Sequence, residues 1–345
     1  MTVINKLFSN EAVDPLIIAE DGQAHDGSLG TAHAFIEGVA EAGADIIKFQ
    51  THIADEESSA QEPWRVKFSI QDDSRFDYWK RMEFTKEQWL GLKKHAEECG
   101  LIFLSSPFSV AAFRLLNDLG TIAWKVASGE ITNLPLIKAM ISTQKPILFS
   151  SGMASLSEID DAVLMCEQAN INFALFQCTT EYPSPAEHWG LDLISHFKHK
   201  YNCPVGLSDH SGTIYAPLAA VALGAKIVEV HVTFSRNSFG PDVESSVTFS
   251  ELKKIVSGSK LISKSLRNPV EKDLLFSEMG QSRKLFGHSL IAKAGIKKGE
   301  ILSEDNICTR KPCLGIPVKE FYSSIGRKVN RDLSAMEFIQ PEDIV

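Results

Sequence analysis

Lysine and histidine side chains end several short apolar runs of this 345-residue chain, and these residue types bind anions and metals. Lys48 and Lys125 are each flanked by apolar residues. A charged amine in such surroundings requires an anionic partner, because burying an unpaired charge is costly. Three interpretations are open. The lysines bind a phosphate or carboxylate, one of them forms a Schiff base with a carbonyl substrate, or each pairs with Glu20, Glu130 or Glu229.

Two histidines, His210 and His231, lie at the ends of two successive apolar runs. Imidazoles at the same depth on neighbouring strands can hold a divalent metal and leave positions open for a substrate. The alternative is that each is a hydrogen-bonded structural residue. We expect His210 and His231 to be metal ligands. A third histidine, His25, lies in the sequence His25-Asp26-Gly27 and is either a base or a turn residue.

Hydroxyl side chains gather at the same run ends and suit phosphate and carboxylate oxygens. They are Ser106, Ser128, Ser150, Ser151, Thr179, Thr180 and Ser208. The chain has no glycine-rich phosphate loop and no dinucleotide fingerprint. These residues together predict a metal-assisted enzyme that acts on a small phosphorylated or acidic substrate.

Eight apolar runs must position these side chains, and most of the later ones are separated by helical stretches. Strands that alternate with helices predict a parallel sheet, and eight such units predict a (β/α)8 TIM barrel. In this fold the chemistry lies at the carboxyl ends of the strands. The runs are Leu16–Glu20, Ile46–Gln50, Ile102–Ser106, Ala123–Ser128, Ile147–Ser151, Phe173–Thr179, Val205–His210 and Ile227–Thr233.

The spacing predicts a barrel domain over residues 1–266 that closes with a helix at Phe249–Leu266. Ser155 and Glu158 form a predicted capping box, and Gly43 a helix C-cap. The connection between Gln50 and Ile102 is unusually long and rich in aromatic residues, so it is either a lid or an oligomer contact. A polar linker is expected at 267–282, followed by a compact β-rich domain at 283–345.

The composition excludes several classes of protein. A net charge of −9 argues against nucleic-acid binding, which requires a basic surface. No apolar run is long enough to cross a membrane, and the first residues lack a signal-peptide core. The six cysteines are scattered and form no C-x-x-C pair. Reduced thiols and a cytoplasmic location are therefore expected.

The motifs at the run ends, taken together, resemble the sialic acid synthase family, which includes pseudaminic and legionaminic acid synthases and spore coat polysaccharide biosynthesis protein E. The residues after about 283 resemble the antifreeze-like (SAF) domain of that family. The motifs, in chain order, are Ile17-Ile18-Ala19-Glu20, His25-Asp26-Gly27, Lys48-Phe49-Gln50, Ser106-Pro107-Phe108, Lys125-Val126-Ala127-Ser128-Gly129-Glu130, Ser151-Gly152-Met153, Cys178-Thr179-Thr180-Glu181-Tyr182-Pro183, Gly206-Leu207-Ser208-Asp209-His210-Ser211-Gly212, Glu229-x-His231 and Gly240-Pro241-Asp242.

The resemblance implies condensation of phosphoenolpyruvate with an N-acylated amino sugar in its aldehyde form, giving a nine-carbon 2-keto acid and phosphate. It implies Mn²⁺ or Mg²⁺ on His210 and His231, and Glu20 as general acid/base. We assign His25, Lys48, Lys125, Glu130 and Glu229 to catalysis as well. The predicted substrate-binding residues in the barrel are Gln50, Ser106, Phe108, Ser128, Ser151, Thr180, Tyr182, Ser208, Asp209 and Asp242.

The family further implies a domain-swapped homodimer in which the SAF domain offers an arginine to the partner's site. Here that turn contains Arg310 and Lys311, with the arginine one place early, so either residue is a candidate.

The chain also departs from the family pattern at Asp21, Ala24, Val230 and Val243. Because these changes fall on the sugar side, we expect a sugar other than N-acetylmannosamine. The alternatives are a pyruvate-dependent Schiff-base aldolase of the same barrel type, and a catalytically silent carbohydrate-binding relative.

Overall fold

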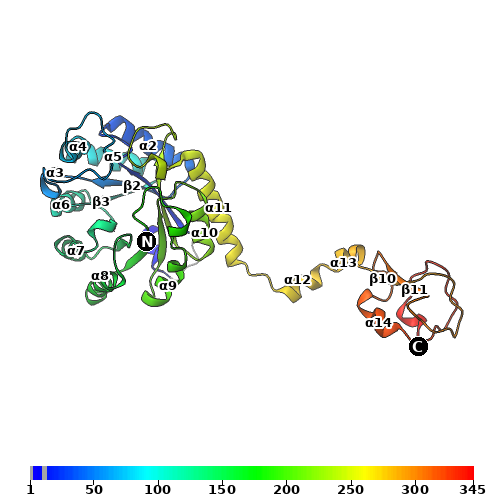
Figure 1. The fold of residues 1–345 in the computed structure, drawn as a ribbon. Helices are drawn as coiled ribbons and strands as arrows, with labels where there is room; N and C mark the ends of the chain where they lie inside the picture. Colours follow the sequence, from blue (N-terminus) through cyan, green and yellow to red (C-terminus); the bar gives the residue numbers. More distant parts are fainter. Residues whose placement is uncertain (1–2, 10–13) are drawn as a thin grey trace. The chain divides into compact units, whose positions relative to one another are not determined.

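The computed structural model describes residues 3–9 and 14–345. Contacts divide the chain into two compact units, Met1–Asn268 and Pro269–Val345, and each is described by itself (Figure 1). No helix among the described residues is long and apolar enough to cross a membrane.

The first unit is the predicted (β/α)8 barrel. Its parallel strands follow the order β3-β2-β1-β8-β7-β6-β5-β4. β3 and β4, at the two ends of this order, lie side by side, although no ladder joins them within residues 14–345. The strands are β1 (Leu16–Gly22), β2 (Ile46–Thr51), β3 (Ile102–Pro107), β4 (Trp124–Val126), β5 (Ile147–Ser150), β6 (Phe173–Cys178), β7 (Val205–Asp209) and β8 (Ile227–Thr233).

Helices surround the strands and begin and end where local signals predict (Figure 1). The Ser155–Glu158 capping box opens α8, and left-handed Gly43 ends α2. The helices are α1 (Val3–Leu7), α2 (Leu29–Ala42), α5 (Lys86–Glu98), α6 (Val110–Asp118), α7 (Leu134–Ile141), α8 (Leu156–Gln168), α9 (Asp192–Tyr201), α10 (Tyr215–Ala222) and α11 (Phe249–Arg267). A short strand, β9 (Val247–Thr248), pairs with β8.

The barrel interior changes from apolar to polar along each strand. Since side chains alternate across a strand, Ile18 and Glu20 share one face of β1, and Ile46, Lys48 and Gln50 share one face of β2. Ile18 and Ile46 belong to a buried apolar cluster with Leu104, Leu148, Phe176 and Ile227. Because of the same alternation, the next inward-facing residue along each strand is charged or polar. These residues form a second layer inside the barrel, and the candidate site lies in this layer.

The long connection after β2 folds into an insertion over residues 52–85, with α3 (Ala54–Glu57) and α4 (Arg75–Met82). It has its own buried cluster of Ala54, Tyr78, Trp79 and Met82, against which Trp64, Phe68 and Phe76 pack.

The second unit matches the β-rich SAF domain expected from the sequence. β10 (Ser289–Ala292) and β11 (Ile307–Arg310) pair antiparallel, and isolated bridges such as Val329–Ile344 add to them. The unit also contains α12 (Lys272–Glu278), α13 (Gly280–Phe286) and α14 (Phe321–Ser324), so the segment predicted as a linker is largely helical. Leu290, Ile307, Ile316 and Ile339 belong to its separate core.

Candidate active site

Four buried charged groups meet in the polar layer of the barrel. The Glu20 carboxylate lies 2.5 Å from Lys48 Nζ, because β1 and β2 place these residues side by side. Glu229 Oε1 lies 3.8 Å from Lys48 Nζ and 3.7 Å from Lys125 Nζ, and it accepts a hydrogen bond from Ser208 at 3.0 Å. The lysines therefore pair with Glu20 and Glu229, as one of the three interpretations had it.

The electrostatics keep Glu229 charged. Burial by itself raises the pKa of this carboxyl, but Lys125, Lys48 and the Ser208 hydroxyl outweigh it and lower the pKa to about 2. Burial lowers the pKa of Lys125, against the attraction of Glu229. The pKa of Lys48 is raised, since Glu20 and Glu229 outweigh its burial. The group is a compact, balanced cluster of two cations and two anions.

His210 and His231 lie together beside this cluster, with ring centroids 5.3 Å apart. His210 Nδ1 is 2.7 Å from the Thr179 carbonyl oxygen, so Nδ1 carries the hydrogen and Nε2 the lone pair with which this ring would bind a metal. Burial, with His231 nearby, lowers the pKa of His210 to about 3, which keeps the imidazole neutral. Within residues 14–345 no third histidine, cysteine or carboxylate completes a cluster around them. A metal on this pair would therefore need water or substrate in its other positions.

A cavity of about 350 Å³ opens above these groups. Several residues predicted from the sequence line it: Gln50, Phe108, Ser128, Glu130, Thr180, Tyr182, His231 and Asp242. Lys48, Lys125, Ser106 and Ser208 lie buried in the layer beneath, with Lys48 Nζ donating to Ser106 at 3.4 Å and Lys125 Nζ to Ser150 at 2.5 Å. Ser151 is also buried and donates to Gln177.

The insertion supplies the rest of the cavity wall, which favours the lid interpretation. Its lining residues, which the sequence analysis did not assign to the site, are His52, Glu57, Glu62, Trp64, Arg65, Val66, Phe68, Arg75, Tyr78 and Trp79. Arg65 Nη2 donates to Asp242 at 2.9 Å, and its guanidinium lies 4.2 Å from the Tyr182 ring centroid. In the sequence, the aromatic content of this segment was the feature that indicated a contribution to the site.

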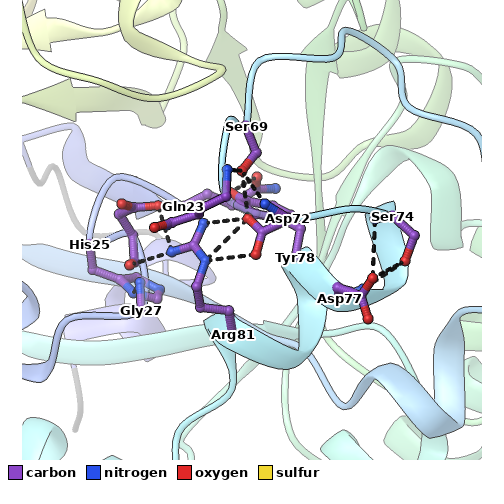
Figure 2. Close-up of polar contacts among 11 residues, drawn as sticks. Gln23, His25, Gly27, Ser69, Asp72, Ser74, Asp77, Tyr78 and Arg81 are labelled. Carbon is purple, nitrogen blue, oxygen red and sulfur yellow. Dashed lines mark hydrogen bonds and ion pairs between the residues drawn. The ribbon is translucent and has the colours of Figure 1, made fainter.

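Figure 2 shows how the insertion is fastened to the loop after β1. Arg81 on α4 forms a two-pronged contact with Asp72, at 3.0 and 2.8 Å, and also donates to Asp26 Oδ1 at 2.8 Å. The Tyr78 hydroxyl donates to Gln23 Oε1 at 2.7 Å. These contacts join α4, near the carboxyl end of the insertion, to the residues that follow Glu20.

Other predicted residues lie away from the cavity. His25 packs against Phe84, and its Nδ1 accepts the backbone N–H of Gly27 at 3.0 Å, which favours the turn interpretation over the base. Asp209 accepts hydrogen bonds from the backbone and hydroxyl of Ser211, and burial raises its pKa to about 6. It too organises a turn.

Two further predicted residues belong to the second unit. Arg310 ends β11, and Lys311 follows it, 6.0 Å from the Phe286 ring centroid.

Comparison with known protein families identifies the family of this chain. The model of the NeuB family matches residues 35–271, and that of the SAF domain matches residues 287–345. This chain belongs to the NeuB family. It is accordingly an enzyme of the synthase type, a transferase.

Similar proteins cover nearly the whole chain. The N,N'-diacetyllegionaminic acid synthase of Campylobacter jejuni is 36% identical over 94% of this chain and 98% of its own length. Among solved structures, the N-acetylneuraminic acid synthetase of Leptospira borgpetersenii is 33% identical with a TM-score of 0.70, over 79% of this chain and 92% of that one. The spore coat polysaccharide biosynthesis protein spsE of Bacillus subtilis is 33% identical with a TM-score of 0.65, over 97% and 96%.

Proposed function

We propose that this NeuB-family enzyme condenses phosphoenolpyruvate with the open-chain aldehyde of an N-acylated amino sugar. Carbon 3 of phosphoenolpyruvate forms the new bond to the aldehyde carbon, water adds at carbon 2, and phosphate leaves. The product is a nine-carbon 2-keto acid. The single observation that supports this most is the pairing of two lysines and two glutamates beside His210 and His231, beneath one cavity.

The chain's own groups divide the work between the two substrates. Lys48 and Lys125, with the nearby serines, offer cationic and hydroxyl donors to the phosphate and carboxylate of phosphoenolpyruvate. Glu20, held beside Lys48, is the general acid/base for the proton on water or on the sugar oxygen. His210 and His231 would hold Mn²⁺ or Mg²⁺, a Lewis acid that polarises the sugar aldehyde.

We further propose a dideoxy diacetamido hexose as the preferred sugar. Asp21, Ala24 and Val243, which depart from the family pattern, line one cavity of about 10 Å³, and this cavity shares Pro241 and Asp242 with the main one. These three departures therefore lie close together, next to the part of the main cavity wall formed by Pro241 and Asp242. The wall also carries apolar surface from Trp64, Val66, Phe68 and Met153, which suits methyl groups. The 36% identical relative is named a diacetyllegionaminic acid synthase.

The remaining expectations belong to the same proposal. We propose a cytoplasmic homodimer in which the SAF domain of one subunit contributes Arg310 or Lys311 to the partner's sugar site.

Purified protein incubated with phosphoenolpyruvate, Mn²⁺ and a panel of N-acyl hexosamines tests the function. We expect sugar-dependent phosphate release, a nine-carbon keto acid by mass spectrometry, and loss of both with EDTA. The dideoxy diacetamido sugar should give a higher kcat/KM than N-acetylmannosamine, and the reverse order would refute the sugar assignment. Borohydride trapping of pyruvate on Lys48 or Lys125 would instead establish the aldolase alternative.

A further inference from the structure

A glutamate–histidine pair outside the predicted site contacts the predicted residue Gln50. Glu57 Oε1 lies 2.6 Å from His52 Nδ1, and Glu57 Oε2 accepts the backbone N–H of Ile53 at 3.3 Å. On its other side, His52 Nε2 lies 3.2 Å from Gln50 Oε1. The Gln50 amide in turn donates from Nε2 to Glu20 Oε1 at 2.9 Å. An unbroken chain of hydrogen bonds thus runs from Glu57 to the proposed acid/base, Glu20.

The hydrogen bonds fix which way each group faces. Gln50 must turn its NH₂ toward the Glu20 carboxylate, which only accepts, and so its oxygen faces His52 and the Gln23 amide, 3.4 Å away. Both nitrogens of His52 then face acceptor oxygens, Glu57 on one side and Gln50 on the other. These two contacts hold the His52 ring between the Glu57 and Gln50 oxygens.

Two aromatic rings hold the His52 ring in place. The His52 ring lies between Trp79, at 4.0 Å between centroids with 21° between planes, and Phe108, at 4.4 Å and 18°. His52 is 5% exposed. Parallel stacking on both faces prevents the ring from rotating out of the hydrogen-bonded plane.

We propose that His52, held by Glu57, is a positioning residue that fixes the Gln50 amide and, through it, the orientation of the Glu20 carboxylate. With Glu20 Oε1 bound to Gln50 and Oε2 on Lys48, the carboxylate has one orientation toward the sugar. Without His52, the Gln50 oxygen keeps only the longer contact with the Gln23 amide, so the Gln50 NH₂ is held less firmly toward Glu20. The inference rests on the proposed function for the role of Glu20, whereas the contact between His52 and Gln50 does not depend on it.

A double-mutant cycle on the full-length enzyme tests the positioning role. His52→Phe keeps a ring between Trp79 and Phe108 but removes both nitrogens. We expect kcat to fall roughly 10- to 100-fold, while KM for phosphoenolpyruvate and for the sugar change less than about twofold. In a Gln50→Ala background the same change should lower kcat less than about twofold, because the group through which His52 acts is gone. Equal losses in both backgrounds would overturn the proposal.

A matched control is His188→Phe, which removes the histidine of an exposed pair with Glu181 at 2.8 Å and should leave kcat unchanged. In NMR spectra the side-chain amide signals of Gln50, assigned by their absence in Gln50→Ala, should shift in His52→Phe and stay in place in His188→Phe. Unchanged Gln50 signals in His52→Phe would refute the contact through which His52 is proposed to act. Because this spectrum requires no turnover, it separates failure of this inference from failure of the proposed reaction.

Discussion

Arg81→Met tests whether the contacts drawn in Figure 2 hold the insertion over the cavity. Methionine keeps most of the aliphatic length of arginine, so packing beside Tyr78 is largely retained while every guanidinium contact is lost. Those contacts are the pairs with Asp72 and Asp26. Asp72 also accepts from the Ser69 hydroxyl at 2.6 Å, and its pKa is lowered by the hydrogen bond from Arg81.

The size of the effect follows from burial. The Asp72 side chain is 5% exposed, and that of Arg81 is 24% exposed. Breaking a fully buried ion pair by removing one partner costs about 3–5 kcal/mol. Because Arg81 is partly in water, the cost falls below that range, to about 2 kcal/mol. At about 1.4 kcal/mol per tenfold, local opening of the insertion should become roughly 30-fold more frequent.

Hydrogen exchange read segment by segment measures this opening. Amides of residues 52–85 should exchange faster in Arg81→Met, the sugar KM should rise, and binding of phosphoenolpyruvate should change little because its lysines lie beneath the cavity. Adding Asp72→Asn should restore part of the protection, since the stranded charge is removed. Lys86→Met, which breaks an exposed pair with Asp118 on the next helix, is the control. Two results would show that Arg81 does not hold the insertion in place. One is an unchanged amide exchange rate in residues 52–85, and the other is an equal increase in exchange rate across the whole barrel.

Two further variants test the buried charges. Lys125→Met should raise KM for phosphoenolpyruvate at least about tenfold, because a charge-assisted contact is lost. The sugar KM should be nearly unchanged. A raised sugar KM with an unchanged KM for phosphoenolpyruvate would contradict the anion-binding role. Asp21→Ile should raise the free energy of unfolding at pH 8 by about 1–3 kcal/mol, because both carboxyl oxygens of Asp21 are buried without a hydrogen-bond partner. His25 Nε2 lies 3.9 Å from Asp21 Oδ2, but burial lowers the pKa of His25 to about 3, so that ring brings no charge. Burial raises the pKa of Asp21 in the folded state, so the wild type loses stability as pH rises above the unfolded value of about 4. The extra stability of Asp21→Ile over the wild type should therefore shrink as the pH falls toward 4. If the urea midpoints of the two proteins differ by the same amount at pH 4.5 and pH 8, this account is refuted.

The barrel and its polar layer were predictable because they depend on local patterns. Alternation along a strand places Glu20 above Ile18 and Lys48 above Ile46 in the barrel interior, whatever the partners turn out to be. Every barrel strand ends within two residues of the predicted position. β4 ends two residues early, since Ser128 already begins a turn at Ser128–Glu130. Which lysine meets which glutamate was left open, because that depends on strand register and rotamer, which the pattern does not contain.

The insertion shows where such patterns stop being informative. His52 looks like an ordinary residue after a strand, and Glu57 like one acidic residue among several, so no spacing rule couples them to Gln50. Their alignment depends on Trp79 and Phe108, which come from α4 and from the turn after β3, 27 and 56 positions further along the chain. Long-range contacts of this kind follow from how the insertion packs on the barrel. The wall that residues 52–85 contribute to the cavity is therefore the part of the site that required the structure, while the layer beneath it could be predicted from strand ends alone.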